Sequence, residues 1–231
     1  GTNMAYFLRR FQVAAGPHRL ICSTATVGDP VRFIRDLTGR EVRVWGAEDD
    51  RSDIPPKSVM VARPVKQRLF DATVHLLTAL ARSDLGRFLA FSDSRRVVEQ
   101  LVAECHRAGR PEDERASNEA EEDEELPEDK HPARWRILPY RAGYETEDRE
   151  AIQQSLASGG LTGVVATSAM ELGIDIGEIN VILLLNAPPS MKAFWQRMGR
   201  GGRKADGVCL LLDDRGGLPS SDGDLSAYIQ R

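Results

Sequence analysis

Uniformly apolar segments separated by helical patterns constrain the fold of this 231-residue chain more than any other feature. The segment Val181–Leu185 reads Val-Ile-Leu-Leu-Leu, with no polar residue at alternate positions. Strands of this kind are buried on both faces, as in parallel sheets that helices cover from both sides. The sequence predicts strands at 87–91, 134–138, 163–166, 181–185 and 208–212, and helices at 67–82, 94–108, 146–157 and 191–199. This alternation predicts an α/β fold with a doubly wound, mostly parallel sheet.

The first part of the chain has a different pattern. Arg19–Cys22 and Glu41–Trp45 favour short strands, and Val31–Leu37 shows helical spacing that ends at Gly39. Asp49–Lys57 is charged and contains prolines, which indicates an exposed linker. We therefore expect one region over residues 1–58 and a single larger domain over residues 59–231.

Charge is distributed unevenly along the chain. Glu112–Asp129 holds eleven acidic residues and one basic residue, a net charge of −10. Because the whole chain carries −4, the remainder carries +6, and a mildly basic body suits a phosphate-backbone partner. We expect residues 110–132 to form a disordered insertion in the larger domain. It is either a solvated loop or an acidic mimic of nucleic acid.

Composition argues against several classes of protein. No apolar run approaches the roughly twenty residues that a membrane helix needs, and no signal-peptide pattern opens the chain, so we expect a cytoplasmic protein. Cys22, Cys105 and Cys209 are far apart and form no Cys-x-x-Cys pair, so we expect neither a metal site nor a disulfide. The opening Gly-Thr-Asn-Met looks more like a cut within a longer protein than a native beginning.

Two glycine-bearing runs follow predicted strands. Ala166–Gly177 reads Ala-Thr-Ser-Ala-Met-Glu-Leu-Gly-Ile-Asp-Ile-Gly, and Gln196–Arg203 reads Gln-Arg-Met-Gly-Arg-Gly-Gly-Arg. A guanidinium offers a planar fork of donors with permanent charge, and it stabilises the charge on a transferring phosphoryl group. Arg200 and Arg203, set among glycines, therefore suit the gripping of a nucleotide's phosphates.

Together the two runs resemble motifs V and VI of superfamily 2 helicases, which lie in the second RecA-like domain of these nucleic-acid motors. Ser23–Thr26 resembles motif III, at the end of the first RecA-like domain, and Phe88–Arg96 resembles motif IV. Tyr140–Tyr144 resembles the element where a small residue and a glycine let a phosphate approach the backbone. The wording of these runs is similar to that of mitomycin-repair-type DNA helicases, and the DISARM phage-defence helicases are candidate relatives. The resemblance implies a RecA-like fold.

The resemblance also implies roles in handling ATP. Arg200 and Arg203 would be catalytic residues that reach the γ-phosphate from an exposed interdomain cleft, with Gln196 bonding nearby. Gly173 and Asp175 would belong to the nucleotide site, where Asp175 holds a ribose hydroxyl or couples to motif VI. A plainer alternative is that Asp175 only turns the loop before the next glycine.

Further residues would contact the nucleic-acid strand along which the motor moves. The resemblance assigns nucleic-acid contacts to Thr167, Ser168, Ser92, Arg95, Gly143, Thr24 and Thr26. The last two would also relay between the ATP site and the interdomain cleft. Hydroxyls and glycine amides can hold a phosphate backbone without reading bases. Alternatively, Ser92 and Ser94 could simply cap the following helix. Phe194–Trp195 favours core packing over base stacking.

No Gly-x-x-x-x-Gly-Lys-Ser/Thr phosphate loop is present, and the Asp-Glu pair that holds magnesium in such motors is missing. The resemblance therefore implies the C-terminal half of an ATP-dependent helicase or translocase, inactive toward ATP by itself. ATP and Mg²⁺ would be held mainly by a first RecA-like domain of the same protein. The partner would be single-stranded or duplex DNA, with RNA left open. Alternatives are a non-catalytic RecA-like binding or scaffold module, and a double-stranded DNA translocase in phage defence.

Overall fold

A computed structural model describes residues 2–16, 18–23, 27–46, 48–52, 55–83, 85–109, 136–171 and 176–214. The chain divides into two compact units, Gly1–Asp53 and Ile54–Arg231. Across the described ranges, no helix combines the length and the apolar character needed to cross a membrane.

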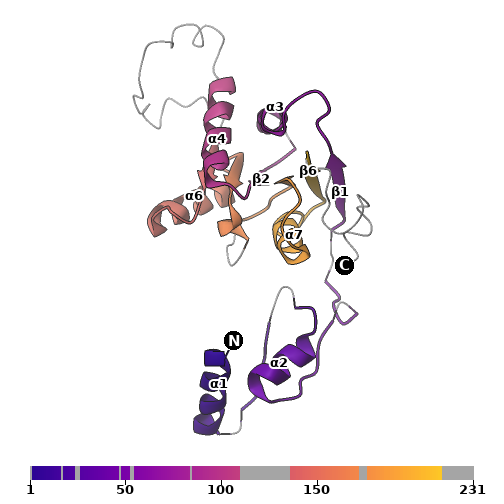
Figure 1. Cartoon of the computed structure of the whole chain (residues 1–231), viewed down its shortest axis with the longest axis vertical. Helices are drawn as coiled ribbons and strands as arrows, with labels where there is room; N and C mark the ends of the chain where they lie inside the picture. Colours follow the sequence, from indigo (N-terminus) through magenta and orange to yellow (C-terminus); the bar gives the residue numbers. More distant parts are fainter. Residues whose placement is uncertain are drawn as a thin grey trace. The chain divides into compact units, whose positions relative to one another are not determined.

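A six-stranded sheet forms the centre of the second unit (Figure 1). Its strands are β1 (Lys57–Ala62), β2 (Phe88–Phe91), β3 (Ile137–Tyr140), β4 (Gly163–Ala166), β5 (Val181–Leu185) and β6 (Gly207–Leu212). The strands lie in the order β1-β6-β5-β2-β4-β3, and every neighbouring pair is parallel. The predicted parallel sheet is confirmed. The strand expected at 134–138 begins at Ile137 and ends at Tyr140 instead.

Helices cover both faces of this sheet. They are α3 (Leu69–Arg82), α4 (Arg95–Gly109), α6 (Thr146–Ser158) and α7 (Met191–Met198), with a short 3₁₀ turn, η2 (Ser168–Met170). Leu89 and Phe91 join one core with side chains of α6 and α7, whereas Phe88 and Ala90 join a second core with α3 and α4. Because both faces are covered, β2, β4 and β5 are buried at every position, which confirms the reading of their uniform apolar character.

The close packing of β2 against β4 requires a glycine. A Cβ atom at Gly163 would lie only 2.2 Å from the Phe88 ring, and the two residues are register partners. Burying a large apolar side chain such as Phe88 contributes about 1.5–3 kcal/mol. A side chain at position 163 would therefore disrupt the centre of the sheet.

The first unit holds two helices, α1 (Thr2–Ala15) and α2 (Pro30–Thr38). Asp29 caps α2, because its carboxylate accepts a hydrogen bond from the Arg32 amide at 2.9 Å, and Pro30 occupies the first helical position. Gly39 ends the helix with a φ of 74°, a left-handed conformation that glycine adopts without strain. The predicted helix and its glycine end are confirmed.

Two predicted strands of the first unit are wrong. The described residues 18–23 and 40–46 belong to no strand. An extended segment is stable only when its backbone groups pair, and the described part of this unit offers no partner strand. Conversely, the sequence pattern does not predict α1 or β1. Helix α1 buries none of its residues, and β1 begins inside the charged stretch expected to be a linker.

Candidate functional site

Most of the residues predicted to contact nucleic acid follow the ends of neighbouring β-strands. Ser92 follows β2, Gly143 lies beyond β3, and Thr167 follows β4. These loops are bonded to one another, since the Ser92 amide donates to the carbonyl of Ala166 at 3.0 Å and the Thr167 amide donates to that of Tyr140 at 3.1 Å. The parallel sheet therefore brings Ser92, Gly143 and Thr167 to one edge, where ligands of open α/β sheets bind.

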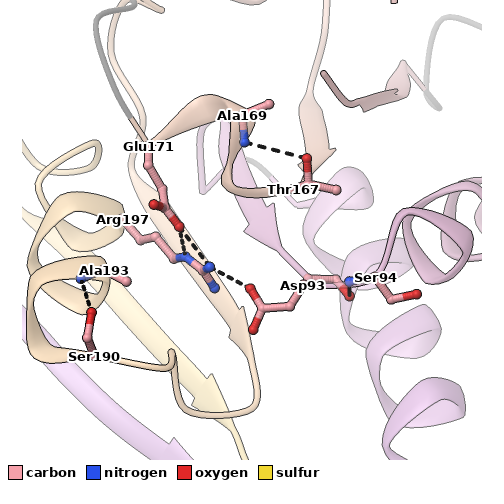
Figure 2. Close-up of polar contacts among 9 residues, drawn as sticks. Asp93, Ser94, Thr167, Ala169, Glu171, Ser190, Ala193 and Arg197 are labelled. Carbon is pink, nitrogen blue, oxygen red and sulfur yellow. Dashed lines mark hydrogen bonds and ion pairs between the residues drawn. The ribbon is translucent and has the colours of Figure 1, made fainter. Parts of the chain in front are cut away.

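The hydroxyls at this edge differ in their freedom to meet a ligand. The buried Thr167 hydroxyl accepts from the Ala169 amide at 3.5 Å and caps η2 (Figure 2). Ser92 is also buried, and its hydroxyl accepts from the Ser94 amide at 3.4 Å. The Ser94 hydroxyl accepts from the Val97 amide at 3.3 Å, so Ser94 caps the start of α4. By contrast, Ser168 and Arg95 are exposed to solvent.

A hollow of about 670 Å³ opens beside these loops. It is lined by Gln67, Arg68, Leu69, Phe70, Ser92, Asp93, Ser94, Val97, Leu185, Asn186, Ala187 and Asp214. The hollow lies at the carboxyl ends of β2 and β5, where the strand order changes direction. Such a switch point is the usual ligand position in an open α/β sheet.

Charged and aromatic contacts fix the turn after β3. The Arg141 Nε donates to Glu99 Oε1 at 2.6 Å, and the Tyr144 hydroxyl donates to the same oxygen at 3.0 Å. The Arg141 guanidinium also lies 4.8 Å from the centre of the Tyr144 ring. Burial, together with the hydrogen bond to Glu99, raises the pKa of Tyr144. These contacts hold Gly143 exposed at the tip of the turn.

Arg197 on α7 is the most buried charged side chain of the site, with 1% of its surface exposed. Its Nε and Nη2 both lie 2.8 Å from Glu171 Oε1, and Nη2 lies 2.6 Å from Asp93 Oδ1 (Figure 2). The guanidinium also lies 5.3 Å from the centre of the Phe91 ring. Its Nη1 has no hydrogen-bond partner among the described residues. Three segments that are distant in sequence therefore meet on one guanidinium.

The sequence places Arg197 on the apolar face of its helix. Ser190 caps α7 by accepting from the Ala193 amide at 3.2 Å, and the buried residues are then Ala193, Phe194, Arg197 and Met198. A buried charge requires a paired partner, and here two carboxylates supply it. No local sequence pattern predicts a role for Arg197, Glu171 or Asp93. The available signal was an arginine at helical spacing from Phe194, together with acidic residues following two adjacent strands.

The remaining arginines of the run lie in the turn after α7, while half-buried Gln196 is still within the helix. Arg200 Nη2 donates to the carbonyl of Glu171 at 2.6 Å, and only 8% of Arg200 is exposed. The expected exposure of Arg200 is therefore wrong, because its guanidinium lies against the segment that follows β4. Arg203 is exposed, and its Nε donates to the carbonyl of Gly199 at 3.1 Å.

Lys57, at the start of β1, completes a basic cluster with Arg200 and Arg203. Gly202 has a φ of 59°, and a Cβ atom there would lie 2.9 Å from Gly207 Cα and 3.3 Å from Lys57 Cε. The missing side chain thus lets β1 and β6 begin against this turn. Burial, and then the charge of Arg203, lower the pKa of both Lys57 and Arg200. Lys57 stands among linker-like residues, so no sequence pattern indicates a role for it.

Several predicted residues lie outside the described part of the chain. They are Thr24, Thr26, Gly173, Asp175 and the acidic insertion 110–132. Their roles stay predictions. Within the ranges that the structure describes, no group of three or more His, Cys, Asp or Glu side chains is placed to hold a metal ion.

Comparison with known sequences identifies the family. Residues 70–205 match the helicase conserved C-terminal domain family. The uncharacterized ATP-dependent helicase YprA of Bacillus subtilis is 29% identical over 219 residues, which cover 91% of this chain and 26% of the relative. The ATP-dependent helicase HRQ1 of Saccharomyces cerevisiae is 29% identical over 232 residues, covering 92% of this chain and 19% of the relative. The chain thus spans about a quarter or less of these relatives' length.

Solved structures with a similar fold bind nucleic acid. The DUF1998 helicase MrfA bound to DNA has a TM-score of 0.74 at 24% identity, covering 93% of this chain and 27% of that one. The Mycobacterium smegmatis helicase Lhr bound to ssDNA and AMP-PNP has a TM-score of 0.63 at 24% identity, covering 91% and 26%. At these identities the likeness shows the fold, which is RecA-like. The chain belongs to the helicase conserved C-terminal domain family and is a superfamily 2 helicase C-terminal domain.

Proposed function

We propose that this chain is the C-terminal motor half of an ATP-dependent nucleic-acid helicase or translocase, with DNA as its partner. One observation carries the proposal: within a single eight-residue run, Arg197 is neutralised by two carboxylates while Arg200 and Arg203 gather with Lys57. The charge of Arg203 lowers the pKa of both Arg200 and Lys57, and a bound anion would counter this repulsion between like charges. The polyphosphate of ATP is an anion of the required charge.

The ATP side of the proposal assigns Arg200, Arg203 and Gln196 to the γ-phosphate. Arg203 is exposed and can reach a ligand directly. Arg200 donates to the Glu171 carbonyl, and a phosphate oxygen would replace that neutral acceptor with a charged one, which forms a stronger hydrogen bond. Asp175 and Gly173 would complete the nucleotide contacts. Since the chain has no phosphate loop, a first RecA-like domain would hold Mg²⁺ and most of the nucleotide.

In this proposal, the nucleic acid binds at the carboxyl edge of the sheet. Exposed Ser168 and Arg95, the Gly143 turn, and the loop that carries Ser92 lie on neighbouring segments of this edge. Thr167 would act through the capped η2 turn that it stabilises. Thr24 and Thr26 would relay to the ATP site from the first region. Contacts of this kind hold a backbone without reading sequence.

A binding experiment on the chain itself tests the strand side. We expect labelled oligo-dT to bind weakly, with an affinity that falls steeply as salt rises, because phosphate contacts release counterions. Arg95→Gln should weaken binding and reduce the salt slope by about one contact. Arg107→Gln, at the opposite end of α4, removes the same charge and should leave both unchanged. Affinity that is independent of salt, or equal effects of the two variants, would contradict the proposal.

The ATP side makes a simpler prediction for the isolated chain. Phosphate release from ATP should stay at the buffer level, with or without DNA, because the phosphate loop is supplied from elsewhere. Turnover well above that background would show that the chain needs no second half.

A further inference from the structure

One unbroken series of contacts joins the hollow to the arginine turn. Asp93 lines the hollow and contacts Arg197 Nη2 at 2.6 Å. Arg197 in turn contacts the Glu171 carboxylate at 2.8 Å, and the backbone carbonyl of Glu171 accepts from Arg200 Nη2 at 2.6 Å. Glu171 is therefore a junction, because its side chain holds one arginine and its main chain holds the other.

The members of this series differ in exposure. The Asp93 side chain is 54% exposed, whereas those of Glu171 and Arg197 are 14% and 1% exposed. Arg197 holds Glu171 through two nitrogens but holds Asp93 through one. The solvent-side contact with Asp93 is thus the weaker one, and it is the one that a ligand in the hollow can reach.

The negative charge of Asp93 determines how a bound phosphate would change its contact with Arg197. A carboxylate in a loop that receives phosphates would repel them, and Arg197 offsets that repulsion. A phosphate that approaches Ser92–Ser94 adds a second negative charge beside Asp93. The two like charges repel each other, and the attraction between Asp93 and the Arg197 cation becomes more important. Because Arg197 is fully buried and shares Glu171, this change alters the junction that also holds Arg200.

We propose that Asp93 and Arg197 form a relay, in which Arg197 is a positioning residue that transmits strand binding at the hollow to Arg200 through Glu171. The inference rests on the proposed function, since it requires a strand at this edge. Coupling between two sites is reciprocal, so an anion on the arginine turn should also change the affinity for the strand.

NMR spectroscopy of the isotopically labelled chain with a short oligo-dT tests the relay. In the wild type, the DNA should shift the backbone amides of residues 92–94 and also the Nε–H signal of Arg200. Asp93→Asn keeps the size of the side chain and removes its charge at a half-exposed position, so the fold should be retained. The amides of this variant should still shift with DNA, whereas the Arg200 shift should fall to less than half.

Asp214→Asn is the matched control. Asp214 lines the same hollow but lies beside Asn186 rather than Arg197, so its Arg200 response should equal the wild type. Shifts at 92–94 with an undiminished Arg200 response in Asp93→Asn would overturn the relay alone. Wild-type amides at 92–94 that ignore DNA would overturn the strand-binding proposal and the relay together. A reduced Arg200 response in both variants would also count against the relay, because any lost charge would then suffice.

Discussion

Within the run Gln196–Arg203, Arg197 has surroundings opposite to those of Arg200 and Arg203. Arg197 is enclosed and contacts two carboxylates, whereas Arg200 and Lys57 each experience the like charge of Arg203. Burying the Arg197 guanidinium without its carboxylate partners would cost several kcal/mol of stability, so we expect these contacts to stabilise the fold. In the basic cluster, burial and the charge of Arg203 disfavour the charged forms of Lys57 and Arg200, and we expect an added anion to offset this effect. The same residue type is thus enclosed by carboxylates at one position and, in our proposal, binds a ligand three to six positions later.

The largest expected effect on stability comes from Arg197. Arg197→Met leaves the mostly buried Glu171 carboxylate without its cation, and breaking a buried pair in this way costs about 3–5 kcal/mol. Arg203→Met makes the same chemical change at an exposed position and should alter the free energy of unfolding by less than about 0.5 kcal/mol. Chemical denaturation measures both. Equal losses would remove the distinction between the two groups.

A smaller effect is expected at Lys57, where binding can be measured directly. Lys57→Met should weaken the binding of inorganic tripolyphosphate to the chain by about five-fold, since one charged contact is lost from a partly exposed site. Lys192→Met, at an exposed position of α7, should change the affinity little. Isothermal titration calorimetry compares the two. A greater loss for Lys192 than for Lys57 would place the anion site elsewhere.

Lys57 also predicts a dependence of stability on pH. Its pKa is lowered in the folded chain, so at a pH between the folded value and the ordinary value of 10.5 the unfolded chain binds more protons. Stability should therefore rise as pH rises through the folded pKa of Lys57, and this contribution should be absent in Lys57→Met. Tripolyphosphate should raise the pKa of Lys57, which NMR titration of its amine can follow. A pKa that falls on addition of the anion would contradict the cluster.

The smallest effect concerns the half-exposed contacts of Glu99. Burial and the hydrogen bond to Glu99 raise the pKa of Tyr144, so the stability this group contributes is present below pH 10 and lost as pH rises through the folded pKa. Glu99→Gln should lower that pKa in an absorbance titration and cost only a few tenths of a kcal/mol, as exposed pairs do. A loss as large as that of Arg197→Met would mean that exposure does not separate these contacts.

The central part of the fold could be predicted from the sequence because both faces of its strands are buried. Val181–Leu185 is apolar throughout, and few other structures accommodate such a segment. The edge strand β1 has one solvent-facing side and follows two prolines, so its pattern is ambiguous. In the first unit, only Ile34 and Thr38 are buried among the described residues. No core is therefore available among these described residues to stabilise the strand that the alternation of Glu41–Trp45 predicts.

The site divides in the same way. The glycine-bearing arginine run is a local pattern, and the sequence alone indicates phosphate chemistry for it. The partners of Arg197 come from loops after two other strands, and only the order of strands in the sheet brings Asp93 and Glu171 together. The burial of Arg200 is likewise a tertiary effect, because it depends on the carbonyl of a residue after β4.

Single-turnover ATP hydrolysis by Arg203→Ala, in a protein that joins this chain to its proposed first RecA-like half, tests the central claim most directly. Arg203 is exposed, so its loss separates catalysis from folding better than that of buried Arg200. At saturating ATP and DNA, turnover should fall by on the order of a thousand-fold, the contribution of an arginine finger. Arg203→Lys should recover little of it, because an ammonium lacks the planar fork. Nucleotide-free DNA affinity should stay near wild type. Wild-type turnover together with lost DNA affinity would show that this run grips nucleic acid rather than ATP.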